Sequence, residues 1–236
     1  MTKPRVVCLV GPTGVGKSAA ALQLAERFDG EIINADSRQV FRAFPLITAQ
    51  PSAEEQARCP HRLYGFLDTA ARFSAGAWGE RALGHIQRAA FPLLVGGTGL
   101  YLRALFDGIV DIPPIPEALI ARLTETCERE GSVALHRRLE ALDPAYAARI
   151  HANDRQRIVR ALCVYEATGK PFSWWHAQTP PPRDADVLRI GLRLPLDTLT
   201  PLLAKRIDLM IEAGAIEEAR AEYAAHPDGS LPGWSG

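Results

Sequence analysis

A glycine-rich segment near the amino terminus places the tightest constraint on the fold. Residues 11–18 read GPTGVGKS and match the phosphate-loop pattern G-x-x-x-x-G-K-[ST]. The apolar run VVCLV precedes this loop, and helix-forming residues follow it. Glycines let the backbone wrap a phosphate group, so that amide N–H groups and the amino end of the next helix face the anion. We therefore expect an α/β fold in which this loop joins a parallel strand to a helix.

The side chains of the loop suggest how it holds an anion. Lys17 adds a full positive charge, and Ser18 offers a hydroxyl oxygen to Mg²⁺. The alternative, a glycine-rich turn that only connects strand and helix, fits the flanking elements less well. The expected phosphate-binding residues are Gly11, Pro12, Thr13, Gly14, Val15, Gly16, Lys17 and Ser18.

Composition narrows the class of protein. The 236 residues are 47% hydrophobic and 23% charged, which suits one α/β domain with an insertion. No apolar run approaches the roughly 20 residues that span a bilayer, so we expect no membrane association and a cytoplasmic location. The cysteines Cys8, Cys59, Cys127 and Cys163 lack C-x-x-C spacing, which predicts reduced thiols and no structural metal. A net charge of zero neither indicates nor excludes nucleic-acid binding.

A βαβ unit is expected to bring Asp36 to the phosphate loop. Residues 17–28 read as a helix and residues 31–34 as a strand that leads to Asp36. Ligands bind at the carboxyl ends of strands in an open parallel sheet, so Asp36 is predicted to lie on the same rim as the loop. An equally good alternative is that Asp36 or Ser37 caps a following helix. Further along the chain, the S-x-x-E pattern of a capping box at residues 52–55 predicts the start of a short helix, and residues 61–67 form a candidate strand.

A third predicted strand, residues 92–95, ends in Gly96-Gly97-Thr98. The corresponding strand of an ATPase usually ends in an acidic residue that holds magnesium or polarises water. Its absence here argues against ATP hydrolysis. Glycines at a strand end allow a ligand to approach the backbone closely, and we favour that interpretation over a simple turn.

Two proline-rich connectors divide the chain. The first lies at residues 107–116 and the second at residues 180–182. Helices are predicted between them, the first two at residues 117–130 and 132–142, and a strand at residues 187–194 returns to the core. We therefore expect a discontinuous α/β core of residues 1–112 and 187–236 with a helical insertion at residues 113–186.

Basic residues cluster in one stretch of the predicted insertion. Residues 149–160 include four arginines, Arg149, Arg155, Arg157 and Arg160, against the single acidic residue Asp154, and Arg157 and Arg160 share one face of a helix predicted at residues 153–168. Such a face can bind the phosphates of a nucleic acid, although most basic runs are simply solvated.

Arg206 lies in a predicted helix that begins at Thr200-Pro201. Leucine or methionine occupies positions three and four residues away on both sides, which predicts a core-facing apolar stripe. A guanidinium on such a stripe requires an anionic partner, unless its long stem carries it to solvent. Both alternatives remain open at this point.

Four motifs in order resemble the tRNA dimethylallyltransferases, also called tRNA isopentenyltransferases. The similarity runs from about Val6 to Glu218 and rests on GPTGVGKS (11–18), NADSRQV (34–40), PLLVGGTGLY (92–101) and HANDRQRIVRAL (151–162). It implies a P-loop NTPase-like parallel sheet with a helical insertion. It also implies transfer of a dimethylallyl group from dimethylallyl diphosphate to the N6 amine of the adenosine that follows the tRNA anticodon.

The resemblance also implies roles for particular residues. Asp36 would act as a general base, and Lys17, Thr13 and Arg206 would complete the catalytic set with Mg²⁺ held at Ser18. The implied partners are dimethylallyl diphosphate and the anticodon arm of tRNA, bound by a monomer. The implied tRNA-binding residues are Asp36, Ser37, Arg38, Gln39, Thr98, Gln156, Arg157, Ile158, Val159 and Arg160.

Two departures and three alternatives accompany this hypothesis. Relatives often carry a basic residue after the proline connector, where this chain has Ile120 with Arg122 nearby. Residues 231–236 resemble the point just before a further basic stretch of the family, so we expect a truncated form or one without that tRNA-binding part. The alternatives are a nucleotide or small-molecule kinase, a non-catalytic RNA-binding switch, and an adenylate isopentenyltransferase that accepts free nucleotide.

Overall fold

The computed structural model describes residues 3–234, so the terminal residues that we assigned to the core at 1–2 and 235–236 lie outside it. The chain forms two compact units, which are considered separately here. Unit 1 comprises the chain up to Asp107 together with the part from Pro182 onward, and unit 2 comprises Gly108–Pro181. Both divisions fall several residues before the predicted ones at 112/113 and 186/187.

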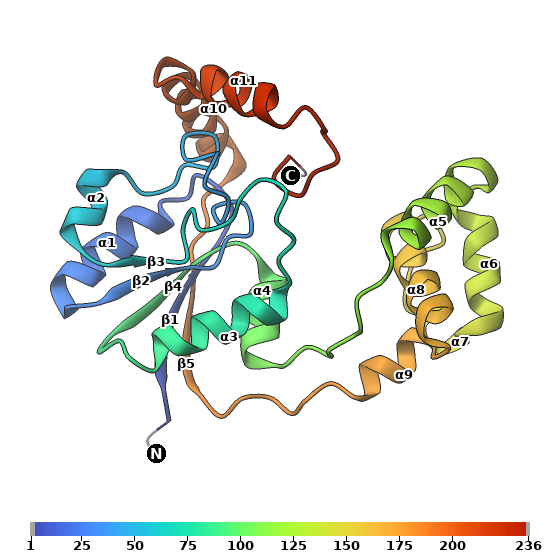
Figure 1. The fold of residues 1–236 in the computed structure, drawn as a ribbon. Coiled ribbons are helices and arrows are strands. Elements are labelled where there is room, and N and C mark those ends of the chain that lie inside the picture. Colours follow the sequence, from blue (N-terminus) through green and yellow to red (C-terminus); the bar gives the residue numbers. More distant parts are fainter. Residues whose placement is uncertain (1–2, 235–236) are drawn as a thin grey trace. The chain divides into compact units, whose positions relative to one another are not determined.

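Unit 1 contains a five-stranded sheet in the order β3-β2-β4-β1-β5. Every pairing between neighbouring strands is parallel, which agrees with the predicted α/β fold. Figure 1 shows helices α1 and α2 along one side of the strands and α3 and α4 along the other. The strands are β1 (Arg5–Val10), β2 (Glu31–Asn34), β3 (His61–Arg62), β4 (Pro92–Gly96) and β5 (Asp186–Gly191).

Local sequence signals account for the first helices of unit 1. Helix α1 (Lys17–Phe28) has the predicted bounds and ends at Asp29, which takes a left-handed conformation with φ 50°. Helix α2 (Ala53–Arg58) begins with a capping box between Ser52 and Glu55. The remaining helices of the unit are α3 (Ala75–Ile86), α4 (Gly99–Phe106), α10 (Leu196–Glu212) and α11 (Ala215–Ala225).

Two predictions for unit 1 are wrong in detail. Strand β3 covers two residues of the expected 61–67, because Leu63 and Gly65 adopt positive φ values of 63° and 52° that interrupt the extended backbone. Helix α10 begins at Leu196, so Pro201 lies inside the helix and not in its first turn.

Helix α10 also does not carry the predicted core-facing stripe. Leu202 and Leu209 are 47% and 55% exposed, and the buried residue of the helix is Leu199. Leu203 is directed at the phosphate loop, since a Cβ atom placed on Gly14 would lie 2.6 Å from its Cδ2 atom. The helix therefore packs on the loop and not on the sheet core.

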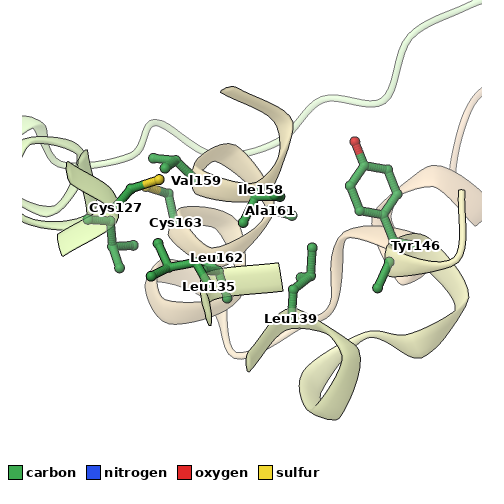
Figure 2. Packing of buried hydrophobic residues seen from close by; sticks show 11 residues of the cluster. Cys127, Leu135, Leu139, Tyr146, Ile158, Val159, Ala161, Leu162 and Cys163 are labelled. Carbon is green, nitrogen blue, oxygen red and sulfur yellow. The ribbon is translucent and has the colours of Figure 1, made fainter. Parts of the chain in front are cut away.

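Unit 2 is helical and has its own apolar core. Helices α5 and α8 supply Leu123, Cys127, Ile158 and Leu162, which are buried against α6 and α7. Figure 2 shows this cluster, with the side chains of α8 directed at those of the neighbouring helices. The helices are α5 (Glu117–Glu130), α6 (Ser132–Leu142), α7 (Pro144–Ala147), α8 (Arg155–Thr168) and α9 (Phe172–Ala177).

The structure also bears on the cysteine and membrane predictions. All four cysteines are free and buried, as expected for reduced core thiols. Among residues 3–234, no helix combines the length and the apolar character needed to cross a bilayer.

Candidate active site

The phosphate loop closes around the side chain of Lys17. Gly14 and Gly16 adopt φ values of 83° and 92°, which only glycine adopts freely. The Lys17 ammonium donates hydrogen bonds of 2.8 Å to the carbonyl oxygens of Gly11 and Pro12. An ammonium group has three protons, so one remains for a bound anion.

A single cavity of about 710 Å³ in unit 1 brings most of the predicted site residues together. Lys17, Asp36 and Arg206 all line this cavity, although they come from three separate parts of the fold. Of the predicted residues in unit 1, Gly11, Pro12, Val15, Ser37 and Thr98 are not part of the lining. Those that line it are Thr13, Gly14, Gly16, Lys17, Ser18, Asp36, Arg38, Gln39 and Arg206.

The charges in the cavity interact with one another. Burial lowers the pKa of Lys17 below its ordinary value of 10.5, the carboxylate of Asp36 opposes that shift, and Arg206 adds to it. Arg206 is half-buried, and among the described residues no carboxylate forms an ion pair with it. The arrangement is therefore suited to a ligand that carries several negative charges.

Asp36 is held at the carboxyl end of β2, as predicted. Its Oδ1 atom accepts a hydrogen bond of 2.8 Å from the backbone N–H of Arg38. Gly96 at the end of β4 lies so close that a Cβ atom there would be 2.7 Å from the nitrogen of Asp36 and 2.2 Å from the carbonyl of Ala35. Gly96 is therefore required by the neighbouring backbone, and it also lines the cavity, so close approach by a ligand stays a prediction.

The other predicted contacts beside Asp36 are already engaged within the protein. Thr98 accepts a hydrogen bond of 2.9 Å from the backbone N–H of Ser37 and donates one of 3.3 Å to the Ser37 hydroxyl. The Gln39 amide donates to the carbonyl oxygens of Thr48 and Ala49 at 2.9 and 2.8 Å. These bonds fix the loop after β2 to β4 and to the 48–49 turn.

Arg38 fastens the segment 231–234 to the rim of the cavity. Its guanidinium donates to the carbonyl oxygen of Gly233 at 2.6 Å and to that of Pro232 at 3.4 Å. Gly233 in turn donates its backbone N–H to the carbonyl of Thr69 at 2.8 Å. Trp234 packs edge-on against Phe44 with ring centroids 4.9 Å apart, and it lines the cavity.

Replacement of Arg38 by alanine is expected to release this segment. The variant loses the charged hydrogen bonds to both carbonyl oxygens, which are worth about 1.5–3 kcal/mol for a bond to a charged group. We expect proteolytic cleavage near residue 231 to become at least several-fold faster than in the parent chain. Arg103→Ala, at an exposed arginine of α4, serves as a control on the same unit, and equal cleavage rates for the parent and Arg38→Ala would contradict the prediction.

Several lining residues were not predicted from the sequence. His61 belongs to β3 and Tyr64 follows that strand, and their rings meet edge-on with centroids 5.7 Å apart. Burial raises the pKa of the Tyr64 hydroxyl, and the charge of Asp36 raises it further. Leu22, Ile32 and Val95 give the same cavity an apolar portion. The only sequence signal for Tyr64 was its place in the candidate strand at residues 61–67.

The oxygen donors in the cavity fit the predicted Mg²⁺. The Ser18 side chain is exposed to the cavity, and the Asp36 carboxylate faces the same space. Mg²⁺ commonly takes one or two protein oxygens and completes its shell with water and substrate phosphates. Consistent with such a sparse site, the described part of the chain holds no group of three or more His, Cys, Asp or Glu side chains that could bind a metal alone.

The predicted RNA-binding residues of unit 2 form two groups, one exposed to solvent and one buried. Gln156, Arg157 and Arg160 are exposed on α8. Ile158 and Val159 are 0% and 8% exposed and belong to the helical core, so the predicted RNA contacts of their side chains are corrected. Burial at these positions follows from the helical period, which turns them away from the exposed face.

Comparison with known proteins decides the family. A model of the family described as IPP transferase matches residues 39–236. The curated tRNA dimethylallyltransferase of Nitratidesulfovibrio vulgaris strain DP4 is 60% identical over 99% of this chain and 77% of its own length. This chain belongs to the tRNA dimethylallyltransferase family. The assignment makes it a prenyltransferase and favours neither the kinase nor the non-catalytic alternative.

Other members of the tRNA dimethylallyltransferase family agree with this assignment. The enzyme of Oleidesulfovibrio alaskensis is 56% identical over 98% of this chain and 77% of its own length. The crystal structure of the tRNA isopentenylpyrophosphate transferase from Bacillus halodurans is 34% identical, with a TM-score of 0.64 over 98% of this chain and 73% of that one. A eukaryotic dimethylallyltransferase described as acting on tRNA is 29% identical, with a TM-score of 0.79 over 98% of this chain and 58% of that one.

Proposed function

We propose that this chain transfers the dimethylallyl group of dimethylallyl diphosphate to the N6 amine of the adenosine 3′ of the anticodon in tRNA. The supporting observation is that Lys17, Arg206 and Asp36 line one cavity. Two cations suit the diphosphate, and the carboxylate suits the amine that must lose a proton. Family membership supports the same chemistry.

The phosphate loop and Arg206 would hold the leaving group. As the allylic carbon–oxygen bond breaks, negative charge grows on the diphosphate, and Lys17, the loop amides and Arg206 stabilise it. Mg²⁺ held at the hydroxyl of Ser18 would supply further neutralising charge. The exposed Thr13 hydroxyl lies in the same lining and can donate to a phosphate oxygen.

Asp36 would act on the acceptor. The adenine amine donates its electron pair to the allylic carbon, and its proton passes to the carboxylate of Asp36 while diphosphate departs with the electron pair of the broken bond. The target base must be unstacked from the anticodon loop before it can enter such a cavity. The apolar portion formed by Leu22, Ile32 and Val95 offers room for the five-carbon group.

A transfer assay tests the proposal against its alternatives. The chain is incubated with Mg²⁺ and radiolabelled dimethylallyl diphosphate, with either tRNA or AMP as acceptor. We expect label in tRNA and little in AMP. Label in AMP alone would indicate an adenylate isopentenyltransferase, and turnover of ATP with a hydroxyl acceptor would indicate a kinase. Binding of tRNA without label transfer under any condition would indicate a binding module.

The exposed arginines of α8 are proposed to contact the tRNA phosphates. We expect Arg160→Ala to weaken tRNA binding several-fold and to reduce the salt dependence of binding by about one counterion, while the affinity for dimethylallyl diphosphate stays unchanged. Filter binding at several salt concentrations measures both quantities. Arg129→Ala, an exposed arginine of α5 paired with Glu130, is the matched control. Equal effects of the two variants would contradict a specific role for Arg160.

A further inference from the structure

A buried asparagine lies next to Asp36, the proposed general base. Asn34 is the last residue of β2, two positions before Asp36, and its exposed fraction is 0%. A fully buried amide is costly unless its donors and acceptor are all paired. The contacts of this side chain therefore indicate what the asparagine does.

The side-chain amide of Asn34 forms hydrogen bonds with both backbone groups of Asp36, and this pair of bonds is called the Asn34 bracket. Its Oδ1 atom accepts a hydrogen bond of 2.8 Å from the backbone N–H of Asp36, and its Nδ2 atom donates one of 2.9 Å to the carbonyl oxygen of the same residue. With the bond from the Arg38 N–H to the Asp36 carboxylate, both the backbone and one carboxylate oxygen of Asp36 are fixed. The second carboxylate oxygen is left for the cavity.

The same amide reaches the loop that carries Tyr64. The Nδ2 atom of Asn34 also donates to the carbonyl oxygen of Leu63 at 2.9 Å. Leu63 has φ 63°, a conformation that bulky side chains rarely adopt and that persists only where surrounding contacts hold it. Because Tyr64 follows immediately and lines the cavity, Asn34 couples two segments of the lining that are distant in sequence.

Asn34 is itself immobilised from the other side. The indole N–H of Trp78 donates to its backbone carbonyl at 2.9 Å, and the Trp78 ring stacks on Tyr101 with centroids 4.5 Å apart. The amide is therefore anchored to the buried framework and not to a mobile surface. Asn34 is not itself one of the residues predicted to belong to the site.

We propose that Asn34 is a positioning residue that holds the Asp36 carboxylate in its orientation for proton transfer and keeps Tyr64 beside it. This inference rests on the proposed function of Asp36. Misplacement of a reacting group by about 1 Å can cost about 100-fold in rate, so loss of the bracket has a measurable effect without removal of the carboxylate.

A double-mutant cycle tests the proposal in the full chain with tRNA and dimethylallyl diphosphate. Asn34→Ala is expected to lower kcat about 10- to 100-fold while KM for dimethylallyl diphosphate changes less than twofold. In an Asp36→Ala background, Asn34→Ala is expected to cause no further loss, because it acts through the carboxylate. Losses that multiply in the double variant, or a donor KM that rises as kcat falls, would overturn the positioning role.

Two controls separate positioning from folding and from failure of the proposed function. Asn34→Asp keeps the shape and the acceptor but loses both donated bonds, and it should follow Asn34→Ala in the cycle; activity equal to the parent would overturn the proposal. Gln87→Ala, at an exposed amide that caps the carboxyl end of α3, should match the parent. The rise in melting temperature caused by dimethylallyl diphosphate with Mg²⁺ should persist in every variant. Full transfer by Asp36→Ala would instead overturn the role of the base itself.

Discussion

Replacement of Asp36 by asparagine is expected to lower the maximal rate of dimethylallyl transfer about 10²- to 10⁴-fold, the range typical for loss of a general base. Asparagine keeps the size of the side chain and its acceptor for the Arg38 N–H, but it cannot take the proton of the adenine amine. Single-turnover transfer from radiolabelled dimethylallyl diphosphate to tRNA measures the chemical step without product release.

The affinity for the donor, dimethylallyl diphosphate, provides a control measurement for the Asp36→Asn variant. Binding of dimethylallyl diphosphate should be nearly unchanged, because its charge is held by Lys17 and Arg206. Asp208→Asn is a matched control, since this exposed carboxylate on α10 is outside the cavity lining. A rate for Asp36→Asn within a few-fold of the parent would remove Asp36 from the mechanism.

Replacement of Lys17 by alanine is expected to reduce transfer about 10²- to 10³-fold, comparable to removal of one preorganised donor from a site where charge develops. The ammonium lies in the lining and retains a proton for the diphosphate, so the loss should appear in kcat and in donor affinity together. Calorimetric titration with dimethylallyl diphosphate and a transfer assay measure the two effects. Lys205→Ala, an exposed lysine of α10, controls for the loss of one charge. Unchanged donor affinity in Lys17→Ala would contradict the proposed diphosphate site.

The pKa of Lys17 gives this prediction a pH dependence. Burial lowers that pKa below 10.5, so Lys17 loses its charge at a lower pH than an ordinary lysine does. Donor affinity should therefore fall as the pH rises through the lowered pKa. In Lys17→Arg the guanidinium stays charged, and the alkaline decline should move to higher pH.

Local signals in the sequence were sufficient for much of the fold. The phosphate-loop pattern predicted α1 with its bounds, and the Ser52 capping box predicted the start of α2. In unit 2, the bounds of α5 and α6 agree with the prediction because glycine and aspartate end these helices after clear amphipathic patterns. Such signals depend on neighbours within a few residues, which a single sequence displays.

The arrangement of residues in the candidate site could not be predicted from local sequence patterns alone. Arg206 was predicted to reach the cavity, but from a buried stripe, whereas α10 is mostly exposed and packs on the phosphate loop through Leu203. Gly96 was predicted as a ligand contact and does line the cavity, but no local pattern indicated that the backbone of Ala35 leaves no room there for a side chain. The Asn34 side chain joins the end of β2 to Leu63, which directly follows β3 and is 29 residues away, and no periodicity indicates such a bond.

The way in which unit 2 is inserted into the chain of unit 1 has a consequence for protein engineering and for evolution. In unit 1, the backbone N–H of Arg183 donates to the carbonyl of Phe106 at 2.7 Å, so the chain leaves and re-enters the core at adjacent points. Neither β5 nor α4 would have to shift if the intervening 74 residues, Gly108–Pro181, were exchanged for a short turn. Helical insertions of different length can thus be introduced at this junction without a change in the shape of the cavity in unit 1.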